Sequence, residues 1–232
     1  MPSAAQPPAT RLKAVGFDLD GTLHDRDTSL AAFVASQHSK FALEPYASLA
    51  TWREHFIALD AGGMVWKDKV YQALTTEWQL PWSWQKLLAD YEDNFAESAR
   101  PFPDAIATLV ALKSRGLALG LITNGKAKLQ AAVIASLGIE GFFSTILISE
   151  TEGLAKPDPL IFARLLEKLS VSAENVAFVG DSLRADVEGA HKAGLYSIWL
   201  NHATPASLPE TADAVVHALA EVTSLPRISE CA

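Results

Sequence analysis

The chain has 232 residues, of which 49% are hydrophobic and 20% are charged. This composition is typical of a globular protein with a sizeable core, and it excludes an intrinsically disordered chain. The 19 Lys and Arg residues and the 27 Asp and Glu residues give a formal net charge of −8. Because no run of like charges forms a basic stripe, nucleic acid and anionic membranes are poor candidates as partners.

The sequence also indicates the compartment. The single cysteine, Cys231, can form neither a disulfide within the chain nor a cysteine-based metal site. The opening residues lack the apolar core of a signal peptide, and no later segment approaches the run of ~20 apolar residues that a membrane helix needs. We therefore expect a cytoplasmic protein.

Taken in chain order, the sequence alternates between two patterns. Residues 1–10 are small and rich in proline, and we expect a flexible tail there. Short apolar segments with the pattern of buried strands follow at 14–20, 117–122, 145–148, 176–179 and 196–200. Helical patterns lie between the later segments, at 104–115, 127–137, 160–169 and 184–193. This alternation predicts an α/β protein with a parallel, doubly wound sheet.

One stretch breaks the alternation. Residues 28–99 contain no convincing strand and instead show amphipathic helical patterns at 28–41, 48–61, 67–78 and 81–99. We interpret this stretch as an inserted helical module. The predicted domains are therefore a core formed by 11–24 and 101–232 and a helical cap domain formed by 25–100.

The first strand pattern ends in two carboxylates, Asp18 and Asp20, followed by Gly21 and Thr22. Open parallel sheets bind their ligands at the carboxyl ends of the strands, which is where this pair stands. Two acids at this spacing suit an ionised nucleophile beside a general acid/base. An isolated pair of this kind could equally be two solvated turn residues.

Further polar residues follow the other strand patterns on the same side of the predicted sheet, where they can converge. They are Thr123, Asn124, Lys156, Asp181 and Asp186. Each has a simpler explanation on its own, because Thr123, Asn124 or Asp181 could cap a helix and Lys156 could be a solvated loop residue. Their recurrence at successive strand ends favours a single site.

Phosphate chemistry would account for this set of residues. An attacking carboxylate repels a phosphoryl dianion, at a cost of about 4 kcal/mol per pair of unit charges 4 Å apart. Asp18, Asp181 and Asp186 offer hard oxygen ligands for Mg²⁺, and Lys156 supplies a further positive charge. The Thr123 hydroxyl and nearby backbone N–H groups can bind phosphoryl oxygens.

Four blocks of the sequence resemble the four motifs of the haloacid dehalogenase superfamily. They are GFDLDGTLHD, LITNG, AKPDP and VGDSLRADVEGA. The resemblance covers the whole chain after the tail. It implies a Rossmann-like parallel sheet core with an inserted α-helical cap domain after the first motif, where this sequence has its helical module.

The resemblance also implies a role for each motif residue. Asp18 would be the nucleophile that becomes an aspartyl-phosphate, and Asp20 the general acid/base. Lys156 would bridge the nucleophile and the phosphate, and Thr123 would hold the phosphoryl group with Asn124 beside it. The Mg²⁺ ligands would be Asp18, the backbone carbonyl of Asp20 and Asp181. Asp186 would either bind the ion directly or support one of these ligands.

Asp20 discriminates within the superfamily, because the dehalogenase and phosphonatase branches lack an acid at this position. An alkoxide leaving from phosphorus needs a proton, whereas a halide does not. We therefore predict a Mg²⁺-dependent phosphatase acting on a small phosphorylated metabolite, such as a sugar phosphate, a phosphoglycolate-like acid or a nucleoside monophosphate. A phosphotransferase or phosphomutase is the alternative on the same residues, and a non-catalytic phosphate-responsive protein is the alternative of another class.

The cap should determine specificity, and five of the six tryptophans lie in it. Most of them are expected to pack the helical bundle. Trp66 and Lys67, beside the Gly62-Gly63 turn, are the candidates for contact with the substrate. His24, which follows the first motif at the border of the cap, is expected to line the entrance to the site.

Overall fold

The computed structural model describes residues 11–203 and 208–229, so the predicted tail and Cys231 lie outside the described residues. The chain divides into two compact units. The first comprises the described parts of Met1–His24, Pro101–Gln130 and Gly138–Ala232, and the second comprises Asp25–Arg100 and Ala131–Leu137. Residues 131–137 thus belong to the second unit, although the sequence analysis assigned them to the core.

The first unit contains a six-stranded, fully parallel sheet in the order β3-β2-β1-β4-β5-β6. Its strands are β1 (Ala14–Phe17), β2 (Ala118–Thr123), β3 (Thr145–Ile148), β4 (Val176–Gly180), β5 (Tyr196–Leu200) and β6 (Ala214–Val216). The predicted α/β fold with a Rossmann-like sheet is confirmed. The sequence analysis missed β6, which has only three residues and pairs with β5 at the edge of the sheet.

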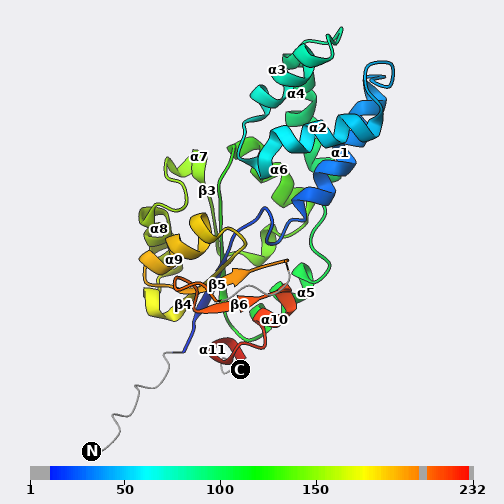
Figure 1. Ribbon diagram of the computed structural model, residues 1–232. Helices are drawn as coiled ribbons and strands as arrows, with labels where there is room; N and C mark the ends of the chain where they lie inside the picture. The colour runs from blue at the N-terminus through cyan, green and yellow to red at the C-terminus, as the bar shows by residue number, and fades with distance from the viewer. Residues whose placement is uncertain (1–10, 204–207, 230–232) are drawn as a thin grey trace, which may run out of the picture. The chain divides into compact units, whose positions relative to one another are not determined.

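Strands β1 and β4 are buried along their whole length, which explains why they consist of continuous apolar residues. Figure 1 shows α8 and α9 on one side of the sheet and α5 and α10 on the other. On the α8 side, Phe162 packs edge-on against Phe178 of β4, with ring centroids 5.0 Å apart. This packing fixes the frame from which the loops at the carboxyl ends of the strands emerge.

Four helices that begin in the described part of the sheet unit correspond to the predicted ranges, and three further helices of four residues each were not predicted. They are α5 (Ala105–Ser114), α6 (Ala127–Ser136), which ends in the second unit, α7 (Ser149–Glu152), α8 (Pro159–Leu169), α9 (Glu188–Lys192), α10 (Leu219–Val222) and α11 (Pro226–Ser229). One difference bears on the site. The single helix predicted at 184–193 begins as a π-helical turn, η5 (Leu183–Val187), before it continues as α9.

The second unit is helical, as the pattern at 28–99 indicates. Its elements are α1 (Arg26–Lys40), α2 (Leu49–Asp60), the 3₁₀ turn η1 (Ala61–Gly63), α3 (Lys67–Glu77), α4 (Trp84–Asn94) and the 3₁₀ turn η2 (Phe95–Ser98). The helix predicted at 81–99 begins only at Trp84, because Ser83 caps it by accepting a hydrogen bond from the Lys86 N–H. It ends at Asn94, where the 3₁₀ turn η2 begins.

Aromatic side chains form much of the interior of the helical unit. Trp52 is fully buried, and its ring lies 5.1 Å from that of Trp78. The Trp82 indole N–H donates to the Phe41 carbonyl at 3.1 Å. These three tryptophans pack the unit, as expected for most tryptophans of the cap.

Within the part of the chain that the structure describes, no helix has both the length and the apolar character needed to cross a membrane.

Candidate active site

The sheet order explains how distant motifs meet. Strand β1 lies between β2 and β4, and all three run in the same direction. Asp18 directly follows β1, Thr123 ends β2, and Asp181 directly follows β4. The carboxyl ends of three adjacent strands therefore bring these residues to one edge of the sheet.

Asp18 and Lys156 form the centre of the site, and both are buried. The Lys156 ammonium contacts Asp18 Oδ1 and lies 2.6 Å from Asp186 Oδ1. Burial alone would lower the pKa of Lys156, but the carboxylates of Asp18 and Asp186 outweigh that effect and raise it above its usual value. Lys156 is therefore a charged member of the site and not a solvated loop residue.

Asn124 holds the loop that carries Lys156. Its side-chain N–H donates to the Lys156 carbonyl at 2.9 Å, and its side-chain oxygen accepts from the Lys156 N–H at 2.9 Å. This reciprocal pair resembles a rung of a β-ladder and fixes the backbone of Lys156. In this structure, the Asn124 side chain positions the lysine.

Three carboxylates surround the centre. Asp18, Asp181 and Asp186 each offer one oxygen, and these oxygens lie within 4.8 Å of one another. Burial raises the pKa of Asp18 to about 7, with a further contribution from Asp186, while Lys156 opposes the rise. Burial and the charge of Asp18 likewise raise the pKa of Asp181 to about 6.

Burial also raises the pKa of Asp186. Three carboxylates with one ammonium leave an excess of negative charge in a mostly buried place, and this excess disfavours ionisation. A divalent cation would neutralise it, and carboxylate oxygens are the ligands that hard cations prefer. The residues present therefore fit a divalent metal ion.

The loops that carry these acids are tightly anchored. Gly21 has φ +85°, and a Cβ atom there would lie 2.3 Å from Asp181 Oδ2, so only glycine fits. The Trp199 indole N–H donates to the Asp181 carbonyl at 2.9 Å. Ser182 caps η5 by accepting from the Ala185 N–H at 3.1 Å. Ser182, not Asp181, is therefore the helix cap, and the Asp181 carboxylate belongs to the acidic cluster.

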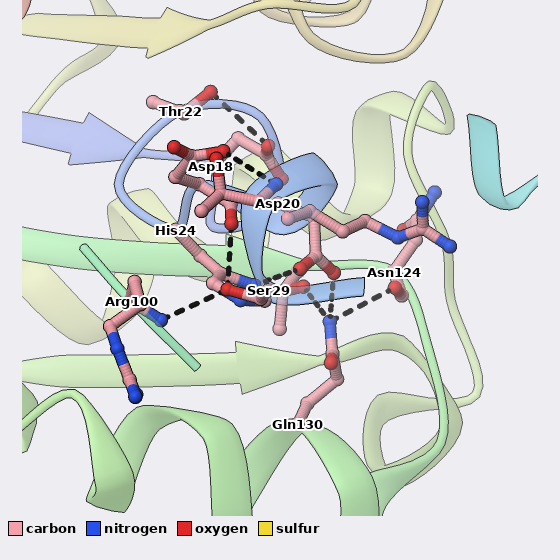
Figure 2. A network of polar contacts seen from close by, with 12 residues as sticks. Asp18, Asp20, Thr22, His24, Ser29, Arg100, Asn124 and Gln130 are labelled. Atoms are coloured by element: carbon pink, nitrogen blue, oxygen red, sulfur yellow. Dashed lines mark hydrogen bonds and ion pairs between the residues drawn. The ribbon is translucent and has the colours of Figure 1, made fainter. Parts of the chain in front are cut away.

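Asp20 lies in a different environment from Asp18. One of its oxygens, Oδ1, lies 2.6 Å from His24 Nδ1, and the other, Oδ2, accepts a hydrogen bond from the Gln130 side chain at 2.8 Å (Figure 2). His24 is fully buried, so the expectation that it lines the entrance is wrong. The N–H groups of residues 22–24 all donate to the Leu19 carbonyl, and this tight turn brings His24 back to Asp20.

The two cap candidates differ in their surroundings within the helical unit. The Trp66 side chain is 63% exposed and precedes α3. The Lys67 ammonium contacts the buried carboxylate of Asp60, to which the Arg26 guanidinium also donates at 2.8 Å and 3.1 Å. Lys67 is thus part of an ion-pair cluster beside the η1 turn.

Sequence reasoning missed several residues of the site. Gln130 and Trp199 were not considered, and His24 was considered only for another place. The one available signal was the position of Gln130 seven residues after Thr123, which places it in the first turn of the following helix, near the end of β2. A polar residue there could be inferred to turn back toward the strand end.

With this geometry in place, the comparison with known proteins gives the class. The sequence pattern of the haloacid dehalogenase-like hydrolase family matches residues 12–194. The chain belongs to this family and is a hydrolase.

Individual relatives within this family are named phosphatases. The chain is 32% identical over 191 residues to a phosphoglycolate phosphatase from Neisseria gonorrhoeae, covering 81% of this chain and 79% of that protein. It is 31% identical over 234 residues to a glyceraldehyde 3-phosphate phosphatase from Pyrococcus furiosus, covering 95% and 92%. Among solved structures, the HAD-hydrolase YfnB from Bacillus subtilis has a TM-score of 0.75 at 24% identity, covering 93% and 99%, which supports the fold.

Proposed function

We propose that the protein is a Mg²⁺-dependent phosphatase that hydrolyses a small phosphorylated metabolite in the cytoplasm through an aspartyl-phosphate intermediate. The observation that carries the proposal is the separation of two neighbouring acids. Asp18 is paired with Lys156 inside the acidic cluster, while Asp20 is held apart by His24 and Gln130. Two carboxyl groups in different environments can take the different roles of nucleophile and acid/base.

In the first half of the reaction, an oxygen of Asp18 attacks phosphorus and the bond from phosphorus to the ester oxygen breaks. Protonated Asp20 gives its proton to the departing oxygen, so the product is a neutral alcohol. Lys156 stabilises the negative charge of Asp18 before the attack and that of the phosphoryl group during it. The Thr123 hydroxyl holds a phosphoryl oxygen.

In the second half, Asp20 is a carboxylate and takes a proton from water. The water oxygen attacks phosphorus, and the bond from phosphorus to Asp18 breaks. Inorganic phosphate leaves, and Asp18 and Asp20 return to their starting protonation states. The sum of the two halves is the hydrolysis of one phosphomonoester by one water molecule.

Asp18, Asp181, Asp186 and the Asp20 backbone carbonyl would hold the Mg²⁺ ion. When bound, the ion supplies positive charge that offsets the repulsion between the nucleophile and the phosphoryl group. The relatives support the choice of substrate class, because their names specify small phosphorylated compounds.

A phosphate-release assay tests the proposal. The purified chain is incubated with Mg²⁺ and a panel of phosphomonoesters that includes phosphoglycolate, glyceraldehyde 3-phosphate and p-nitrophenyl phosphate. We expect steady release of inorganic phosphate from at least one ester, and none from Asp18→Asn. The matched control is Asp27→Asn, which makes the same change at an exposed position of α1 and should retain activity. Equal release by wild type and Asp18→Asn would refute the covalent mechanism.

A further inference from the structure

The side chain of Gln130 connects two residues of the site. Gln130 lies on α6 and is 4% exposed. Its amide nitrogen lies 2.8 Å from Asp20 Oδ2 (Figure 2). The same nitrogen lies 2.5 Å from Thr123 Oγ1. The residue therefore touches both the acid/base carboxyl and the hydroxyl assigned to the phosphoryl group.

The chemistry of the amide fixes the direction of both hydrogen bonds. An amide nitrogen has two N–H groups and does not accept hydrogen bonds, so it must be the donor to Asp20 and to Thr123. Thr123 Oγ1 then accepts from Gln130, which leaves its own O–H to donate elsewhere. Such a hydroxyl can donate to a phosphoryl oxygen.

The orientation of Asp20 is fixed from both sides. Gln130 donates to one carboxyl oxygen, while His24 Nδ1 lies 2.6 Å from the other. Two partners on the two oxygens determine the plane of the carboxyl group as well as its position. His24 is fully buried and Gln130 nearly so, which limits the freedom of both partners.

The adjacent backbone is adapted to this side chain. Gly125 directly follows Asn124, and a Cβ atom at Gly125 would lie 2.9 Å from Gln130 Cγ and 3.1 Å from Gln130 Cδ. The absence of a side chain at Gly125 therefore leaves the space that the Gln130 side chain occupies. A side chain at position 125 would therefore displace Gln130.

We propose that Gln130 is a positioning residue that sets the acid/base carboxyl of Asp20 and the phosphoryl-binding hydroxyl of Thr123 relative to each other. This inference rests on the proposed phosphatase function. A carboxyl group transfers a proton efficiently only when it is held within hydrogen-bond reach of the leaving oxygen. Loss of Gln130 should therefore weaken proton donation to the leaving group in addition to phosphoryl binding.

The test compares two esters in the Gln130→Met variant, which keeps the length of an unbranched side chain and removes the N–H donors. An alkyl phosphate needs protonation of its leaving group, whereas p-nitrophenyl phosphate does not. We expect kcat/KM for the alkyl ester to fall about tenfold further than kcat/KM for the aryl ester. In an Asp20→Asn background, Gln130→Met should leave the ratio of the two values unchanged, because the group that it positions is gone.

The control variant is Val133→Ala, which removes buried apolar volume from the same helix without touching a donor. It should lower the melting temperature and reduce both kcat/KM values by the same factor. Gln130→Glu is a second variant of nearly unchanged shape. If Gln130→Met does not fold, Gln130→Glu should show the same selective fall in kcat/KM for the alkyl ester.

The outcomes are distinct. A selective loss for the alkyl ester that disappears in the Asp20→Asn background supports the role of Gln130. Equal losses for both esters in the Gln130 variants, as in Val133→Ala, overturn it while leaving the phosphatase function intact. A wild-type protein that hydrolyses neither ester overturns the proposed function itself, and the inference with it.

Discussion

Replacing Asp18 by Asn should change how the stability of the metal-free protein depends on pH. The substitution keeps the shape of the side chain and removes one carboxylate from the buried cluster with Asp181 and Asp186. The Asn side chain can still accept a hydrogen bond from Lys156. The expected difference therefore comes mainly from the ionisation of Asp18.

The magnitude follows from the pKa of Asp18, which rises from 3.8 to about 7 in the folded protein because the group is buried. Between these two pH values, the folded state binds a proton that the unfolded state has released. The contribution of Asp18 to the free energy of unfolding is therefore fully present below pH 3.8 and is lost as the pH rises through 7. At about 1.4 kcal/mol per pKa unit, the loss approaches about 4 kcal/mol by pH 8.

The assay is urea unfolding in EDTA at pH 5 and at pH 8, for wild type, Asp18→Asn and the exposed control Asp27→Asn. Wild type and Asp27→Asn should lose more stability between the two pH values than Asp18→Asn loses. Adding Mg²⁺ at pH 8 should stabilise wild type more than Asp18→Asn, because the ion binds the folded state and needs the carboxylate. Identical pH profiles for wild type and Asp18→Asn would refute the reasoning.

Four further substitutions test the chemistry and the cap. Asp20→Asn should slow alkyl phosphates at least tenfold more than p-nitrophenyl phosphate, which a comparison of kcat/KM values checks, and equal losses would remove Asp20 from the acid/base role. Asp181→Ala should raise the Mg²⁺ concentration needed for half-maximal activity or abolish activity, and undiminished turnover in EDTA would contradict the metal assignment. Trp66→Ala should lower kcat/KM for the preferred metabolite several-fold while sparing p-nitrophenyl phosphate, because the leaving group would contact the cap. Lys67→Ala should do the same but also lower the melting temperature, since Lys67 pairs with buried Asp60; losses that are uniform and follow stability would show that these residues only support the helical unit.

The sequence was informative where burial is complete. Strands such as β1 and β4 are apolar along their whole length because they are covered on both sides, and that pattern is visible in the sequence alone. Strand β6 was not predicted, because an edge strand of three residues is too short to show a hydrophobic period. The turn η5 was predicted only as ordinary helix, since its π-helical hydrogen bonds have no sequence period of their own.

The residues of the site also divide into those that the sequence could predict and those that it could not. The motif residues that follow the strands could be predicted to converge, because the parallel sheet brings their positions to one edge. The partners of Asp20 could not, because a side chain that reaches back to a strand end from a turn or a helix is determined by rotamers and packing. His24 was assigned to the entrance and Gln130 was only near a strand end in sequence, so their contacts with Asp20 became visible only in the structure.

The central position of β1 has a consequence for the order of synthesis. Ala14 pairs with Ala118 of β2 and with Val176 of β4, so the first strand made must wait for most of the chain before both neighbours exist. The helices between β1 and β2 leave the ribosome during that wait. Their contacts span shorter stretches of chain than the pairing of Ala14 with Val176, as the hydrogen bond from Gln37 to Asp90 shows, so they can form sooner. The nascent chain should therefore acquire its helical unit first, and the catalytic carboxylates should come together only near the end of translation.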